Sequence, residues 1–192
     1  MQTKQIAIFA SGNGSNALNI IDFFSENDQI NVALLLSNNP NAPIIAKAKA
    51  RGIDTLILTN EAVANSNLLI AACVNHAIDF VVLAGYLRKI PVEFIHFYAN
   101  KIINIHPSLL PKFGGRGMYG DFVHKAVIEQ KESKTGITIH FVNEEFDKGE
   151  VIAQFELKVD QLDDLDTLRK KISELEMKHF PTIIEEVILN TK

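Results

Sequence analysis

The chain has 192 residues, of which 47% are hydrophobic, and its 19 Lys and Arg against 23 Asp and Glu give a formal net charge of −4. This length predicts one domain that buries about 70% of its unfolded surface, and no apolar run approaches the roughly 18 residues of a membrane span. The N-terminus lacks a signal-peptide pattern, the charge argues against a nucleic-acid partner, and the single cysteine, Cys73, excludes an intramolecular disulfide and favours a cytoplasmic location.

Short apolar runs alternate with helical patterns through the first half of the chain. In chain order we expect a strand at 6–9, a helix after Ser15, a strand at 32–36, a helix at 43–51, a strand at 55–58, a helix at 61–77 and a strand at 80–84. The strands are continuously apolar rather than alternating, and each is followed by a helical pattern. Such a pattern is typical of a parallel sheet that is covered on both faces.

The second half of the chain changes character. We expect a strand at 102–105, a Gly-rich loop at 113–120, a helix at 121–130, two strands at 137–142 and 151–159 joined by 143–150, and a long amphipathic helix at 164–189. A proline inside a helix removes a backbone hydrogen bond, so we expect this last helix to be interrupted at Pro181. No repeat or linker divides the chain, which predicts a single α/β domain.

A Gly-x-Gly-x-x-Ala motif begins at Gly12, between an expected strand and an expected helix. The free N–H groups of a helix start attract anions, so the motif predicts a phosphate site. A dinucleotide site also needs an acidic residue about 20 positions further on, and residues 37–39 are Ser-Asn-Asn, which disfavours NAD. The alternative is a simple turn whose helix is capped by Ser15 or Asn16.

Asn104 and His106 lie at the end of an expected central strand, where open α/β sheets bind ligands. Residues two apart on a strand share a face, so the two side chains can converge on one substrate atom. A carboxamide and an imidazole there can stabilise an oxyanion, and the imidazolium can act as a general acid. The alternative is a structural histidine. His140, on a later strand, shares a face with Val142 and can line the same cleft.

Two acidic residues carry weaker signals. Asp147 opens an Asp-Lys-Gly sequence that by default predicts a turn, and a functional role requires it to face His106 and keep the imidazole protonated. Glu176 shares the apolar stripe of the last helix with Ile172 and Phe180, so it lies at the core margin or contacts a ligand. No histidine pair has metal-ligand spacing, so we expect no metal site.

Taken together, the sequence resembles the formyltetrahydrofolate-dependent formyltransferases, and within them the branch that formylates glycinamide ribonucleotide in purine (IMP) synthesis. The segments that carry the resemblance are 11–16 (Ser-Gly-Asn-Gly-Ser-Asn), 81–88, 104–111 (Asn-Ile-His-Pro-Ser-Leu-Leu-Pro), 136–142, 147–149 and 176–181. It implies a Rossmann-like formyltransferase fold with a mostly parallel central sheet, helices on both faces and an antiparallel C-terminal part. Residues 1–100 would form the nucleotide-binding half and 101–192 the catalytic and folate-binding half.

The resemblance also implies roles for individual residues. Asn104 and protonated His106 would hold the oxyanion formed when the ribonucleotide amine attacks the formyl carbon of 10-formyltetrahydrofolate, and Asp147 would keep His106 charged. The ribonucleotide would contact Gly14, Ser15, Asn16, Ala17, Leu18 and Glu176. The folate would contact Leu87, Arg88, Lys89, Ile90, Asn104, Val142, Asn143, Glu144, Glu145, Phe146 and Asp147.

Three other activities use related sequences. A formyltetrahydrofolate hydrolase would direct water at the formyl group with the same trio, but such relatives carry an N-terminal regulatory domain. A methionyl-tRNA formyltransferase would need a further C-terminal domain and a basic surface. A non-catalytic nucleotide-binding module on the same fold is the third alternative. For the formyltransferase we expect small-molecule substrates, no membrane or nucleic-acid partner, and a monomer or homodimer.

Overall fold

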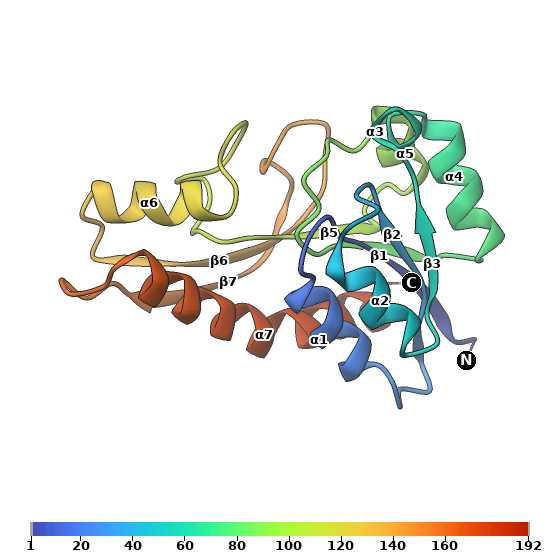
Figure 1. Cartoon of the computed structure of the whole chain (residues 1–192), viewed down its shortest axis with the longest axis horizontal. Helices are drawn as coiled ribbons and strands as arrows, with labels where there is room; N and C mark the ends of the chain where they lie inside the picture. The colour runs from blue at the N-terminus through green and yellow to red at the C-terminus, as the bar shows by residue number, and fades with distance from the viewer. Residues whose placement is uncertain (1, 192) are drawn as a thin grey trace.

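A seven-stranded sheet forms the centre of the computed structural model, which describes residues 2–191 (Figure 1). The strands lie in the order β3-β2-β1-β4-β5-β6-β7. Their bounds are β1 (Lys4–Phe9), β2 (Ile30–Ser37), β3 (Asp54–Ile57), β4 (Phe80–Leu83), β5 (Ile102–His106), β6 (Lys134–Phe141) and β7 (Val151–Lys158). The first five strands pair in parallel, whereas β6 is antiparallel to both β5 and β7. The predicted fold class is therefore confirmed.

Helices cover both faces of the sheet. They are α1 (Ser15–Phe23), α2 (Pro43–Lys49), α3 (Asn60–Val63), α4 (Ser66–Asn75), α5 (Val92–Phe97), α6 (Asp121–Glu129) and α7 (Leu165–Asn190). Because side chains alternate along a strand, Ile6 and Ile8 of β1 pack with α1, α2 and α7, while Ala7 and Phe9 pack with α4 and α5 on the other face (Figure 1). No helix within residues 2–191 is long and apolar enough to cross a membrane.

The order of the strands places a crevice beside β1. The chain leaves β1 toward β2 on one side, and β4 lies on the other side of β1. At such a switch point the connections diverge, so a crevice opens at the carboxyl ends of the strands. The segments that follow β1 and β4, together with His106 at the end of β5, meet at this edge.

One expected helix is divided in the structure, and one helix was missed. The stretch 61–77 is not one helix but two, because the side chain of Asn65 accepts hydrogen bonds from the N–H groups of Asn67 and Leu68 (3.1 and 3.3 Å) and so begins α4 anew. The short helix α5 was not expected from the sequence, and it begins directly after Pro91, whose fixed φ suits a helix start.

The last helix is also continuous through Pro181, although we expected a break there. A proline at 181 has no N–H to donate to the carbonyl of Met177, four residues earlier. That carbonyl instead accepts a hydrogen bond of 2.8 Å from the side-chain Nδ2 of Asn19, on α1. A side chain from a neighbouring helix thus replaces the missing backbone donor, and α7 runs on to Asn190.

The substitution Asn19→Ala should lower the free energy of unfolding by about 1 kcal/mol, because the Met177 carbonyl loses this donor. Chemical denaturation measures the change. In a Pro181→Ala background, residue 181 has an N–H of its own for Met177, so Asn19→Ala should cost less there. Equal costs in the two backgrounds would contradict this account of the helix.

Candidate active site

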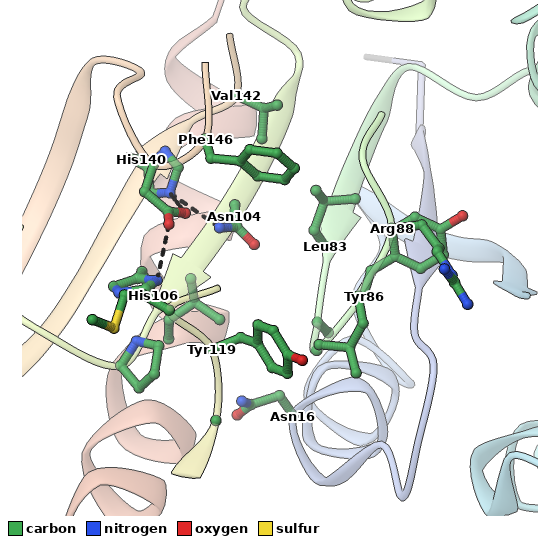
Figure 2. A pocket seen from close by; sticks show the side chains of 18 of the residues that line it. Asn16, Leu83, Tyr86, Arg88, Asn104, His106, Tyr119, His140, Val142 and Phe146 are labelled. Carbon is green, nitrogen blue, oxygen red and sulfur yellow. Dashed lines mark hydrogen bonds and ion pairs between the residues drawn. The ribbon is translucent and has the colours of Figure 1, made fainter. Parts of the chain in front are cut away.

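A cavity of about 600 Å³ opens at the carboxyl ends of β1, β4 and β5 (Figure 2). The predicted site residues that line it are Gly14, Ser15, Asn16, Leu87, Arg88, Lys89, Ile90, Asn104, His106, Val142, Asn143, Glu144, Glu145, Phe146, Asp147 and Glu176. Ala17 and Leu18 do not line it, because Ala17 is buried in the core and Leu18 packs against that core. The structure therefore gathers segments from both halves of the chain around one space.

His106 and Asp147 lie side by side in the lining of this cavity. The imidazole of His106 is buried, with its Nδ1 3.6 Å from Oδ2 of Asp147. Its Nε2 lies 2.8 Å from the carbonyl oxygen of Phe113, and because a carbonyl only accepts, Nε2 carries a proton. Asp147 Oδ2 also accepts from the backbone N–H of Gly115 (2.8 Å). Both side chains are thus held by the backbone of the Gly-rich loop.

Asp147 reaches His106 because of the tight turn that follows β6. Its own backbone is left-handed, with φ of 57°. A Cβ on Gly149 would lie only 1.6 Å from the carbonyl oxygen of Phe141, so residue 149 has to be glycine for the chain to fold back here. The Asp-x-Gly pattern is therefore a turn, as its default interpretation says, and the turn also points the carboxylate at the histidine.

Asn104 faces His140 across two paired strands. The residues lie directly opposite each other on antiparallel β5 and β6, and Asn104 Nδ2 is 3.0 Å from His140 Nε2 (Figure 2). Burial lowers the pKa of His140, against the raising effects of the Phe141 carbonyl and of Asp147. The sequence placed His140 on the cleft face but assigned it no role, because a lone histidine on a strand indicates no particular partner.

The loop that begins at Gly12, which we predict to bind phosphate, leads into α1 without a capping side chain. Gly14 has φ of 70° and is the N-cap of α1, where no side-chain hydrogen bond is found among the described residues. A Cβ there would come within 2.4 Å of Ile44 on α2. The alternative in which Ser15 or Asn16 caps the helix is therefore not what the structure has. The first N–H groups of α1 stay available to an anion at the mouth of the cavity.

Glu176 joins the same end of the cavity. Its carboxylate oxygen Oε2 accepts a hydrogen bond of 2.9 Å from Asn16 Nδ2. Burial raises the pKa of Glu176, although the bond from Asn16 works in the opposite direction. The carboxylate thus lies between α1 and α7 and borders the cavity. Of the two interpretations of Glu176, core margin or ligand contact, its place in the cavity lining favours the second.

The opposite wall brings together the two segments predicted for folate. Lys89 Nζ lies 5.8 Å from the ring centroid of Phe146, so the segments 87–90 and 142–147 contact each other. Glu144 Oε1 is 2.7 Å from Nε2 of His96 on α5, which ties the second segment to the helix layer. The wall therefore combines apolar side chains with both basic and acidic ones, Arg88 and Lys89 on one segment and Glu144 and Glu145 on the other.

The cavity lining also includes residues to which the sequence interpretation gave no role, among them Arg116 and Tyr119 of the Gly-rich loop and His124 of α6. Figure 2 shows the ring of Tyr119 between Asn16 and the Asn104–His106 side. The loop was recognised by its glycines, but a glycine-rich pattern does not say which side chains its turns direct inward. Among residues 2–191, no group of three or more His, Cys, Asp or Glu is arranged to hold a metal ion.

The chemistry available here is that of addition to a carbonyl. An amide N–H, an imidazole N–H and a carboxylate border one space, and such groups stabilise an oxyanion and relay a proton.

Comparisons with known proteins identify what this chain is similar to. The sequence profile described as "Formyl transferase" matches residues 4–184. The phosphoribosylglycinamide formyltransferase of Bacillus subtilis is 36% identical over 190 residues, which cover 96% of this chain and 95% of the relative. The chloroplastic enzyme of that name from Arabidopsis thaliana is 38% identical over 188 residues, and the match spans 94% of this chain but 64% of the plant protein.

Solved structures agree with these relatives. The crystal structure of phosphoribosylglycinamide formyltransferase from Bacillus halodurans superposes with a TM-score of 0.88 at 33% identity, covering 98% of this chain and 97% of the other. The structure of glycinamide ribonucleotide transformylase 1 from Geobacillus kaustophilus has a TM-score of 0.89 at 31% identity, with 97% and 99% covered.

The substitution Gly149→Ala should lower the free energy of unfolding by more than about 2 kcal/mol, since the new methyl group cannot avoid the Phe141 carbonyl without moving the turn. Thermal or chemical unfolding measures this. Gly12→Ala is the matched control, because no atom lies within 4 Å of a Cβ there and its backbone is not left-handed. A Gly149→Ala protein as stable as the control would refute the argument.

Proposed function

This chain belongs to the formyl transferase family, and we propose that it is a phosphoribosylglycinamide formyltransferase that takes its formyl group from 10-formyltetrahydrofolate. The family predicted from the sequence is confirmed, and the enzyme is a transferase of purine biosynthesis. It transfers a formyl group to the amine of glycinamide ribonucleotide. A cytoplasmic location and a monomeric or homodimeric state stay predictions.

The observation that carries the proposal is the meeting of Asn104, His106 and Asp147 in one cavity. In the reaction the ribonucleotide amine adds to the formyl carbon, and the carbonyl oxygen becomes an oxyanion. Collapse of this intermediate re-forms the C=O bond and breaks the bond to N10 of the folate. One proton leaves the attacking amine and one reaches the leaving nitrogen, so the proton balance closes.

The members of the trio have different tasks. Asn104 donates an amide N–H to the oxyanion, and His106 donates from its ring. In this structure the Nε2 proton of His106 lies on the Phe113 carbonyl, so the oxyanion competes with that carbonyl for it. Asp147, 3.6 Å from Nδ1, stabilises the charged imidazole and relays a proton between the two amines.

The two ends of the cavity fit the two substrates. At one end, the N–H groups of α1 after Gly14 bind the ribonucleotide phosphate, and Glu176 contacts its ribose or its amine end. At the other end, segments 87–90 and 142–147 hold the pterin, largely through backbone groups. Residues 1–100 supply the helix start for the phosphate, and residues 101–192 supply the trio and the segment 142–147. Each half also reaches the other's end, because 87–90 borders the folate and Glu176 contacts Asn16.

The first test is turnover of 10-formyltetrahydrofolate, followed by absorbance of the folate product, with and without glycinamide ribonucleotide. We expect turnover that depends on the ribonucleotide, because its amine is the formyl acceptor. Equal release of formate without it would instead indicate a hydrolase that directs water at the formyl group. Folded protein with no turnover in either case would leave a binding module.

Asn104→Ala should lower kcat by about 10²–10³-fold with little change in KM, as expected for loss of an oxyanion donor. His106→Ala should remove most activity while the protein stays folded. Steady-state kinetics and circular dichroism check both. Wild-type turnover by either variant would overturn the assignment of the trio.

Glu176→Gln should raise KM for glycinamide ribonucleotide while KM for the folate stays unchanged, because Glu176 lies at the nucleotide end beside Asn16. The glutamine keeps an oxygen acceptor for Asn16, so the fold is retained. Separate titrations of the two substrates measure the effect. A rise in KM for the folate alone would show that Glu176 acts at the folate end and would contradict this assignment.

A further inference from the structure

We propose that His140 is a positioning residue for the reaction: it stays neutral, accepts a hydrogen bond from Asn104, and thereby fixes the carboxamide with its nitrogen toward the reacting centre. The inference rests on the proposed role of Asn104 as oxyanion donor. It adds a fourth side chain to the trio, one that touches neither substrate and acts through Asn104.

The proton on His140 can be located from its two neighbours. Nδ1 lies 2.8 Å from the carbonyl oxygen of Phe141, and a carbonyl cannot donate, so the proton of that bond is on Nδ1. A neutral imidazole with Nδ1–H has a lone pair on Nε2. This lone pair lies 3.0 Å from the side chain of Asn104, which must therefore present an N–H to it.

The direction of the Asn104 amide follows. One hydrogen of Nδ2 is taken by His140, and the second hydrogen on the same nitrogen remains for a ligand in the cavity that Asn104 lines. If Nε2 carried a proton, Asn104 would have to turn its oxygen toward the ring. The oxyanion would then lose its donor and would face an amide rotated by half a turn.

The surroundings keep His140 in the neutral form. The side chain is 2% exposed, and this burial lowers the pKa of His140. The charged and titratable groups that face it are Asp147, whose Oδ1 is 3.8 Å from Nε2, and His106. Burial outweighs the Phe141 carbonyl and Asp147, which both favour the charged ring, and His106 acts in the same direction as burial.

The backbone also fixes where the ring lies. His140 and Asn104 are cross-strand neighbours on β5 and β6, where opposite side chains approach closely. The pairing of β6 with β7 shifts register between Ile139 and His140, and such irregularities re-aim side chains next to active sites. Neither partner of the hydrogen bond therefore depends on a mobile loop for its position.

The tautomer can be tested without any activity measurement. In full-length protein labelled with 15N in histidine, the two ring nitrogens of His140 should show a protonated Nδ1 and an unprotonated Nε2. The signal is assigned by its absence in His140→Gln, with His76→Gln as a control that leaves it in place. A proton on Nε2, alone or on both nitrogens, overturns the proposal.

A double-mutant cycle tests the coupling to Asn104. His140→Leu removes the acceptor and should lower kcat substantially, by at most the roughly 10²–10³-fold that loss of the oxyanion donor itself costs. In an Asn104→Ala background the same change should have almost no further effect on kcat. Glutamine offers an acceptor oxygen, so His140→Gln should recover part of the activity lost in His140→Leu. Equal fold-losses from His140→Leu in both backgrounds would mean that His140 acts independently of Asn104, which overturns the proposal.

The experiments distinguish failure of the proposed function from failure of the role of His140. If the wild-type protein shows no turnover that depends on the ribonucleotide, the proposed function fails whatever the ring nitrogens show. If that turnover is present and the Nδ1–H form or the coupling is not, the formyltransferase stands and the role of His140 falls. A folded His140→Leu protein, checked by circular dichroism, is required for the kinetic comparison, and the tautomer measurement needs only the wild type and its two glutamine variants.

Discussion

The antiparallel pairing of β5 with β6 is the constraint on which the site depends. Up to β5 the sheet is parallel, and its ends supply loops that bind ligands. Because β6 runs antiparallel to β5, it places His140 directly opposite Asn104. The same strand then ends in the turn that carries Asp147 to His106. One pairing thus joins side chains that are far apart in the chain.

The side chains around Asn104 and His140 are held in position more tightly than the groups at the nucleotide end of the cavity. Around Asn104, both ring nitrogens of His140 have a partner within 3.0 Å, and position 149 in the nearby turn accepts no residue larger than glycine. At the nucleotide end the helix start after Gly14 has open N–H groups. Catalysis of carbonyl addition needs donors that are fixed before the charge develops, whereas a phosphate can organise free amide groups around itself.

The sequence predicted most of the sheet because its parallel strands are continuous apolar runs, such as 80–84, that require no knowledge of distant partners. The sequence also placed the loop after β1 and the pair Asn104 and His106 at one cavity, because parallel strands end at one edge of the sheet and residues two apart on a strand share a face. Their roles in binding and catalysis stay predictions. Asp147 was different: its local pattern indicates only a turn, and the family resemblance alone suggested that the turn faces His106.

The sequence missed one local cap and two interactions between elements. The break in the stretch 61–77 depends on a single capping side chain, Asn65, within an otherwise helical pattern. The partner of His140 depends on the register of β6 against β5, which no local pattern encodes. Pro181 was expected to end a helix because its lost hydrogen bond is visible in the sequence, while the donor that replaces it comes from Asn19, more than 150 residues away.

Because Asn19 binds the carbonyl that Pro181 leaves free, the proline helps to fix the position of α7 along α1. Proline frees one carbonyl along the 26 residues of α7, that of Met177, and Asn19 of α1 binds it. Asn16, one turn earlier on α1, faces Glu176, the residue adjacent to Met177. If α7 slid along α1 by a single turn, about 5.4 Å, both bonds would be lost together. The proline thus helps to set the longitudinal register of two helices, and with it the place where a carboxylate enters the nucleotide end of the cavity.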